Sequence, residues 1–241
     1  MRQCVWVEFQ VDIWYKINTL MAIRLEKGQR INLEKESGTK LTNFCVGCNW
    51  GAIIEKKFFG LLTHVVDVDL DLSCMMFDAA GNVVDHIWSP LYNFRGKLPQ
   101  GKLDSNDHAL HHTGDDRTGD QNGDDGLDNE IITVDLNRVN PNVNSIVFFL
   151  NIYNNSEYSG DFSGIPYASI RMFEGTPDRP PKQVFAQYNV ATKTECAGKR
   201  ALVMGKLYRH NGDWKFAAIG DAFEDRIIGV TIARVARDYS K

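Results

Sequence analysis

Carboxylates are concentrated in one segment of this 241-residue sequence. Residues 104–130 contain nine Asp or Glu residues and a single arginine, Arg117, so the segment carries a charge of −8 in a chain whose net charge is −4. Two carboxylates about 4 Å apart repel each other by about 4 kcal/mol at an effective dielectric constant near 20. The segment must therefore stay open and solvated, take up protons, or bind cations.

The composition of this segment favours a hard cation. Four glycines allow the backbone to curl, Asn122 and Asn129 add neutral oxygen ligands, and cysteine is absent. Oxygen ligands without sulfur select Ca²⁺ or Mg²⁺, and a long flexible loop favours Ca²⁺ because this ion tolerates irregular geometry. An EF-hand frame starting at Asp120 fails, because Asp125 stands at the glycine position and Ile131 at the terminal glutamate position.

A second acidic pattern lies at residues 67–72, where Asp alternates strictly with Val or Leu. Period two predicts a β-strand with Asp67, Asp69 and Asp71 on one face and the apolar side chains on the other. The apolar face would anchor the strand, so the carboxylate row could not swing away. A rigid row and a mobile acidic loop together would suit a hard-cation site. A solvated loop and an exposed edge strand remain open as alternatives.

The rest of the chain predicts an all-β protein with few short helices. Asn211-Gly212 indicates a type I′ hairpin turn, and 145–150 form an apolar run typical of a central strand. Many short strands separated by turns indicate a β-sandwich with long acidic loops. The tail could form one helix over 222–239, capped by Asp221. The expected strands are 4–13, 41–49, 67–77, 83–88, 130–135, 145–153, 167–174, 183–189, 201–209 and 214–220.

Composition and cysteine usage narrow the possible partners and the compartment. The acidic balance argues against a nucleic-acid partner, and no apolar stretch is long enough for a transmembrane segment. Peripheral membrane association stays open. Five cysteines and no expected signal peptide indicate reduced thiols in a cytoplasmic protein. Cys45 and Cys48 form a C-x-x-C inside a strand-like run, which favours buried apolar side chains over a zinc or redox site.

Six sequence blocks in this order resemble the TerD family, the tellurium-resistance and stress-response proteins of bacteria. The resemblance covers residues 22–220 and implies a β-sandwich that binds two Ca²⁺ ions at one end. It also implies a cytoplasmic protein that acts by calcium-dependent association, either with a protein partner or with itself, and not by catalysis. The blocks are Gly28–Leu33, Val46–Trp50, Asp67–Ser73, His112–Gly119, Glu130–Leu136 and Tyr208–Phe216.

The resemblance also implies a ligand set and a domain division. Residues 1–21 and 221–241 would flank the sandwich as an N-terminal extension and a tail. Residues 120–127 look like an insertion relative to the family, and Asn129 and Asn154 stand where acids are common. The predicted metal ligands are Asp67, Asp69, Asp71, Asp115, Asp116, Asp124, Asp125, Asp128, Glu130 and Asn154.

Two other functions use the same residues. Carboxylates near His108, His111 and His112 could hold a metal-activated water in a hydrolase, although the chain lacks the common hydrolase and nucleotide-binding motifs. Trp50, Tyr92 and Trp214 could stack on a small ligand or nucleotide in a sensor, although aromatic residues at strand positions more often belong to the core.

Overall fold

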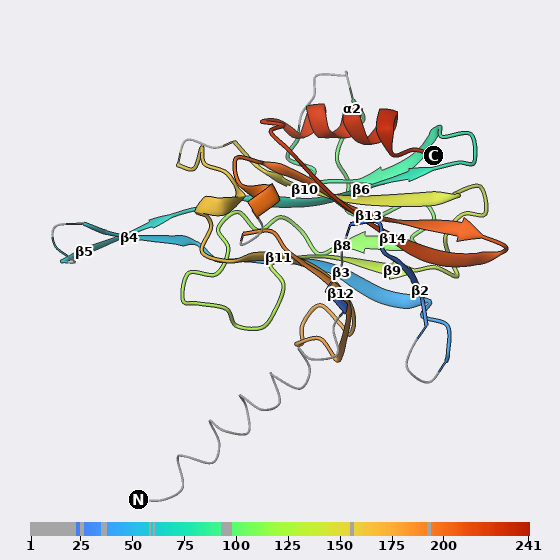
Figure 1. Ribbon diagram of the computed structural model, residues 1–241, viewed down its shortest axis with the longest axis horizontal. Helices are drawn as coiled ribbons and strands as arrows, with labels where there is room; N and C mark the ends of the chain where they lie inside the picture. The colour runs from blue at the N-terminus through green and yellow to red at the C-terminus, as the bar shows by residue number, and fades with distance from the viewer. Residues whose placement is uncertain are drawn as a thin grey trace, which may run out of the picture.

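The fold is a sandwich of two six-stranded β-sheets, with one helix on the outer face of the second sheet (Figure 1). The computed structural model describes residues 23–24, 27–34, 38–57, 59, 61–92, 98–154, 157–191 and 194–241. The expected all-β sandwich with few helices is confirmed. The predicted strand at 4–13 and most of the predicted N-terminal extension lie outside the described residues.

Sheet one has the order β1-β12-β11-β3-β9-β8. Its neighbours pair antiparallel, apart from the parallel pair β1 and β12. Its strands are β1 (Ile23–Arg24), β12 (Gln183–Asn189), β11 (Ala168–Glu174), β3 (Asn43–Trp50), β9 (Glu130–Asp135) and β8 (Leu110–His112).

Sheet two is antiparallel throughout, in the order β2-β14-β13-β10-β6-β7. Its strands are β2 (Arg30–Asn32), β14 (Asp213–Phe223), β13 (Ala201–His210), β10 (Ser145–Ile152), β6 (Leu70–Phe77) and β7 (Val83–Ile87). The predicted hairpin turn joins β13 to β14, and both Asn211 and Gly212 have the positive φ angles of a type I′ turn.

The apolar run in β10 is continuous because both faces of this strand are buried. Ile146, Phe148 and Leu150 point into the core between the sheets. Val147 and Phe149 belong to a second cluster beneath helix α2 (Ile228–Asp238). A strand that is buried on both faces has apolar residues at nearly every position, because neither face contacts water.

Helix α2 is shorter than the sequence suggested. The predicted helix over 222–239 is wrong at its start, because β14 continues to Phe223 in register with Ala201. The helix begins at Ile228, and Asp221 accepts a hydrogen bond from the Tyr239 hydroxyl at 2.6 Å instead of capping it. Thr231 joins the helix to the sheet by accepting a 2.7 Å bond from the Asn151 side-chain amide.

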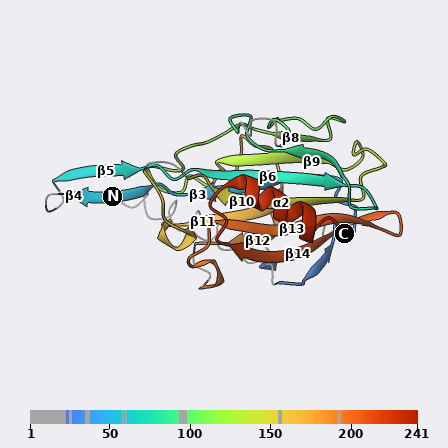
Figure 2. The same cartoon turned by 90° about the horizontal axis from the view of Figure 1, so that it is seen from above.

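Three further segments hold short elements that the sequence did not indicate. A separate two-stranded sheet, β4 (Ile53–Lys57) and β5 (Leu62–Val66), projects from one end of the sandwich (Figures 1 and 2). Two 3-10 turns, η1 (Phe162–Gly164) and η2 (Thr194–Cys196), lie in the connections between later strands.

The packing of α2 yields a stability test. Ile232 is 3% exposed and lies in the cluster beneath the helix, whereas Val230 of the same helix is 44% exposed. Ile232→Ala should lower the free energy of unfolding by about 2–5 kcal/mol through lost burial and a residual cavity. The matched change Val230→Ala should stay within about 0.5 kcal/mol. Equal effects of the two substitutions in urea unfolding would show that α2 is not packed as described.

Candidate metal centre

The acidic loop folds back onto the end of β3. The Ala52 amide donates to the Asp120 carbonyl at 3.0 Å, and the Asp120 amide donates to the Trp50 carbonyl at 2.9 Å. Gly119 has a φ of +68° and passes so close to the Trp50 indole that a Cβ would lie 2.4 Å from its Nε1. This glycine therefore permits both the turn and the close contact between the loop and β3.

The strand predicted from residue 67 begins only at Leu70, and residues 67–69 precede it without strand pairing, yet the alternation at 67–72 has the predicted consequence for its apolar members. Val68, Leu70 and Leu72 all lie in the core between the sheets. Asp69 and Asp71 face the other way but are also buried, with exposures of 7% and 2%. The core contacts of their neighbours therefore hold two carboxylates in fixed positions inside the protein.

Glu130 brings a third buried carboxylate to the same place. Its Oε2 accepts from the Leu72 amide at 2.7 Å, and its Oε1 accepts from the Asp116 amide at 3.1 Å. Leu72 lies in the part of β6 that extends beyond its pairing with β7, which begins at Cys74. Glu130 thus accepts a hydrogen bond from a backbone amide at the edge of β6 and, through the Asp116 amide, links the acidic loop to that edge. We name Asp69, Asp71, Asp115, Asp116 and Glu130 the inner acidic group.

His112 is a neutral hydrogen-bonding residue beside the inner acidic group. Its Nδ1 accepts from the Gly114 amide at 3.0 Å, so the ring proton is on Nε2, which donates to the Leu72 carbonyl at 3.1 Å. Burial lowers the pKa of His112 to about 4. Both ring nitrogens are therefore committed to the backbone.

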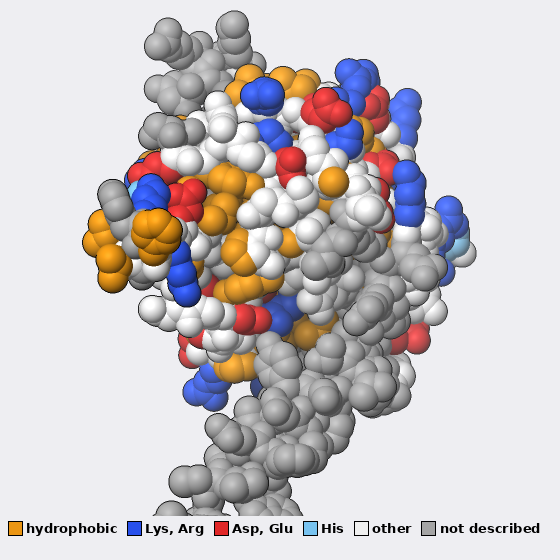
Figure 3. Space-filling view, turned by 60° about the vertical axis from the view of Figure 1, so that its left-hand side comes forward, with side chains coloured by type: hydrophobic (Ala, Val, Ile, Leu, Met, Phe, Trp, Pro, Cys, Tyr) orange, Lys and Arg blue, Asp and Glu red, His pale blue; other side chains and the backbone are white. Residues whose placement is uncertain are grey.

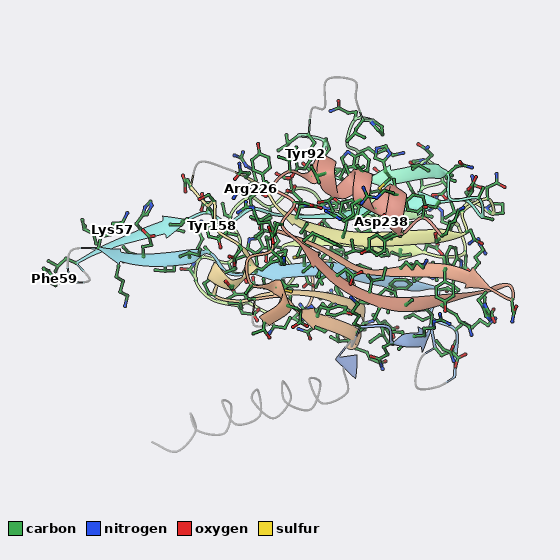
Figure 4. All side chains as sticks on the ribbon, turned by 45° about the horizontal axis from the view of Figure 1, so that its top comes forward. Lys57, Phe59, Tyr92, Tyr158, Arg226 and Asp238 are labelled. Atoms are coloured by element: carbon green, nitrogen blue, oxygen red, sulfur yellow. The ribbon has the colours of Figure 1, made fainter. Side chains whose placement is uncertain are left out.

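Burial and mutual repulsion disfavour ionisation of Asp69, Asp71 and Glu130, the three buried members of the inner acidic group. Burial, reinforced by the charge of Asp115, raises the pKa of Asp69 to about 7. Burial raises the pKa of Asp71 well above its ordinary value, and Glu130 and Asp69 add to this rise, whereas the hydrogen bond from the Tyr92 hydroxyl opposes it. Tyr92 lies on the same side of the sandwich as α2 (Figure 4).

Two buried oxygens in this region lack a donor among the described residues. They are Oδ1 of Asp69 and Oδ1 of Asn151. Asn151 lies directly opposite Asp71 in the β6–β10 register, so the two side chains share one face of the sheet. Buried polar atoms are nearly always satisfied, and unsatisfied carboxylate and amide oxygens suit a hard cation. The residues present therefore fit Ca²⁺.

A second acidic group lies further out in the loop. Asp120, Asp124 and Asp125 each present a carboxylate oxygen within 4.8 Å of the others. Oxygens bound at about 2.3–2.6 Å on opposite sides of one Ca²⁺ have a similar separation. Asn49 of β3 donates to Asp124 Oδ1 at 3.0 Å, while its own buried Oδ1 lacks a donor among the described residues. We name Asp120, Asp124 and Asp125 the outer acidic group.

Asp128 stands apart from both groups because it has a cationic partner. Arg171 Nε lies 2.9 and 3.0 Å from its two carboxylate oxygens, and Arg171 Nη2 donates to the Gly126 carbonyl at 3.0 Å. Burial nevertheless raises the pKa of Asp128 to about 6. This pair fastens the end of the acidic loop to β11.

The predicted ligands are thus distributed over several surroundings. Asp69, Asp71, Asp115, Asp116 and Glu130 interact with one another, and Asp124 and Asp125 form part of the outer acidic group. Asp67 is half-buried and Asn154 is exposed. Asp120, Asn49 and Asn151 are not among the ligands predicted from the sequence. Asp120 was visible within the acidic run, but the positions of the two asparagines depend on strand register.

The comparisons with known proteins agree with the fold. The TerD domain model matches residues 21–233. The chain is 33% identical to the stress response protein SCP2 of Bacillus subtilis (strain 168) over 89% of this chain and 99% of that protein. It is 30% identical to the tellurium resistance protein TerD of Serratia marcescens, over 87% and 95% of the two chains.

A solved structure also shares this fold. It comes from Streptomyces coelicolor A3(2) and is described as a homologue of telluride resistance protein (TerD). The TM-score is 0.56, with 15% identity over 83% of this chain and 98% of that one.

The raised pKa values predict how stability depends on pH without divalent cations. Because folding raises the pKa of Asp69 to about 7, the native state holds protons that the unfolded state has released. Stability should therefore fall as pH rises from 6.5 to 8 in EDTA. His112, with its lowered pKa, contributes the opposite trend, but mainly below about pH 6.5. A melting temperature that rises across this window in EDTA would contradict the assignment.

Proposed function

This chain belongs to the TerD family, and we propose that it is a calcium-binding stress-response protein of the tellurium-resistance type. In this proposal Ca²⁺ orders the acidic loop against β6 and β3 and completes an interaction surface. The observation that carries the proposal is the burial of Asp69, Asp71 and Glu130 together, with donorless oxygens on Asp69 and Asn151 beside them.

The proposal assigns one ion to each acidic group. Asp71 and Asn151 would offer ligands from sheet two, Asp69 from the segment just before β6, and Asp115 and Asp116 from the loop. Asp120, Asp124, Asp125 and the Asn49 amide oxygen would hold the second ion. Bound Ca²⁺ would supply the positive charge that these carboxylates lack. With that charge in place, the carboxylates could ionise and the loop would be linked to both sheets.

Existing contacts support a loop that already lies near its bound position. The Asp116 carboxylate accepts from the Thr118 and Gly119 amides at 2.9 and 3.1 Å, which fixes the first turn of the loop. Asn129 donates to the Asp120 carboxylate at 3.1 Å and accepts from the Trp50 amide at 2.8 Å. The loop would need only local adjustment to bind, so less conformational entropy would be lost.

The alternatives find less support in the described residues. Both nitrogens of His112 bond the backbone, and the His111 ring pairs with Asp104 at 2.9 Å, so neither is placed to activate a metal-bound water. Trp50 is buried and donates to the Val68 carbonyl at 2.7 Å. The Arg209 guanidinium covers Trp214 at 4.4 Å. The relatives are named as stress-response and resistance proteins.

We propose a cytoplasmic location as part of this function. Cys45, Cys48, Cys74 and Cys196 are free and buried, as expected in a reducing compartment. Burial raises the pKa of Cys48 well above its ordinary value, so this thiol stays protonated and unreactive. In the described part of the chain, no helix is long and apolar enough to cross a membrane.

Calcium should stabilise the folded protein. At a free concentration a hundredfold above the dissociation constant, one ion adds about 2.7 kcal/mol. This corresponds to a rise in melting temperature of about 5–10 °C for a chain of this size. Differential scanning calorimetry in Ca²⁺, Mg²⁺ and EDTA measures the effect, and equal melting temperatures in Ca²⁺ and EDTA would sink the proposal.

The variant Asp69→Asn should raise the melting temperature in EDTA but reduce the calcium-induced rise in melting temperature. In EDTA it removes a repelled, buried carboxylate and should raise the melting temperature above that of the wild type. In Ca²⁺ it removes a ligand and should reduce the calcium-induced rise. The matched change Asp213→Asn, at the exposed first residue of β14 paired with Lys40, should leave the calcium response intact. A full calcium response in Asp69→Asn would exclude this residue as a ligand.

A further inference from the structure

The β4–β5 hairpin stands clear of the sandwich. Its two strands pair only with each other in the sheet topology, from Ile53 opposite Val66 to Lys57 opposite Leu62. Figures 1 and 2 show it extending beyond the end of both six-stranded sheets. A two-stranded hairpin without further support is only marginally stable in water.

The outer end of this hairpin is apolar. Phe59 is fully exposed, Leu61 is 84% exposed and Leu62 is 56% exposed. Ile54 on β4 is 42% exposed. Figure 4 shows Phe59 at the extreme end of the hairpin, beyond Lys57. A group of exposed apolar side chains marks a surface that binds a protein partner or a membrane. We name Phe59, Leu61 and Leu62 the apolar tip.

Lysines lie directly behind the apolar tip. Lys56 and Lys57 are exposed, and Glu55 is the only acidic residue among the described residues of the hairpin, 3.3 Å from Lys57. Figure 3 shows hydrophobic and Lys or Arg side chains side by side at this projecting end. An apolar end with cations just behind it complements a surface that is apolar at depth and anionic at its boundary.

The same features argue against a second copy of this chain as the occupant. Lys56 and Lys57 lie on the free edge of β4, where lysine discourages strand addition. A narrow projecting tip also offers far less than the roughly 800 Å² per partner of a stable protein interface. The narrow apolar tip is better shaped to insert into a lipid layer than to form a protein interface.

Both strands of the hairpin are connected directly along the chain to the candidate metal centre. β4 follows Trp50 and Ala52, whose backbone groups bond the Asp120 backbone of the outer acidic group. β5 leads through Asp67 into Asp69 and Asp71 of the inner acidic group. The root of the hairpin therefore lies beside both groups of carboxylates, five residues or about 17 Å from the apolar tip.

We propose that the apolar tip docks this protein on an anionic phospholipid bilayer. Phe59, Leu61 and Leu62 enter the boundary between headgroups and acyl chains, while Lys56 and Lys57 lie among the phosphates. The calcium dependence of this docking rests on the proposed function: without metal, the net negative charge of the acidic loop at the root of the hairpin disfavours approach to an anionic surface, and bound Ca²⁺ would offset that charge.

Vesicle flotation with the full chain tests this inference. Vesicles of phosphatidylcholine alone and with phosphatidylglycerol are compared in Ca²⁺ and in EDTA. The wild type should float with the phosphatidylglycerol vesicles in Ca²⁺ and much less in EDTA. The double variant Phe59→Asp with Leu61→Asp should lose about tenfold or more in partition coefficient, since two apolar side chains no longer enter the bilayer.

Two controls separate insertion from general effects. Val83→Asp with Val230→Asp places the same charges at exposed apolar residues on β7 and α2, and this variant should bind like the wild type. Lys56→Gln with Lys57→Gln should weaken binding to phosphatidylglycerol vesicles at low salt. Undiminished binding by the variant of the apolar tip would overturn the inference.

The melting temperature of the same samples distinguishes the two proposals. A calcium-induced rise in the wild type without vesicle binding would overturn bilayer docking and leave calcium binding standing, with a protein as the partner. Vesicle binding that needs the apolar tip but is equal in Ca²⁺ and EDTA would support docking and overturn its calcium dependence. Vesicle binding that needs the tip, without a calcium-induced rise, would support docking and overturn the proposed function.

Discussion

Like charge held at short range inside the protein is the constraint on which the rest of this structure depends. Asp69 and Asp71 cannot move apart, because Val68, Leu70 and Leu72 between and beside them are anchored in the core. Glu130 cannot leave without abandoning the Leu72 and Asp116 amides. The fold therefore holds these carboxylates where they repel one another. Protons relieve this repulsion up to about neutral pH, as the raised pKa of Asp69 indicates, and a divalent cation could relieve it above that pH.

The same constraint explains why the acidic loop is so heavily tied down. The Asp116 carboxylate accepts from an amide of the loop itself, and Asn129 accepts from the Trp50 amide. The Arg171–Asp128 ion pair fixes the C-terminal end of the loop. A loop with this charge would otherwise spread into solvent. Its attachments also connect it to the roots of the β4–β5 hairpin, so changes in the charge of the loop act next to the part of the molecule that projects furthest.

Much of the sandwich could be predicted from the sequence, and the reasons are local. Alternation at 67–72, the apolar run of β10 and the Asn-Gly turn each follow from a short-range rule. What could not be predicted depends on contacts between distant segments. Asn151 joins the inner acidic group only through its register with Asp71, and Asp128 finds Arg171 across 43 residues. The β4–β5 hairpin escaped prediction because its strands bury little and lack clear alternation.

The order of strands in the sheets has a consequence for synthesis on the ribosome. β2 pairs with β14, and β3 lies between β9 and β11. Strands synthesised early therefore pair with strands that are synthesised much later. Such long-range pairing closes slowly. Until residues beyond 213 emerge, sheet two lacks β14, and β2 has no strand to pair with. A nascent chain would therefore expose part of the core between the sheets until the late strands emerge.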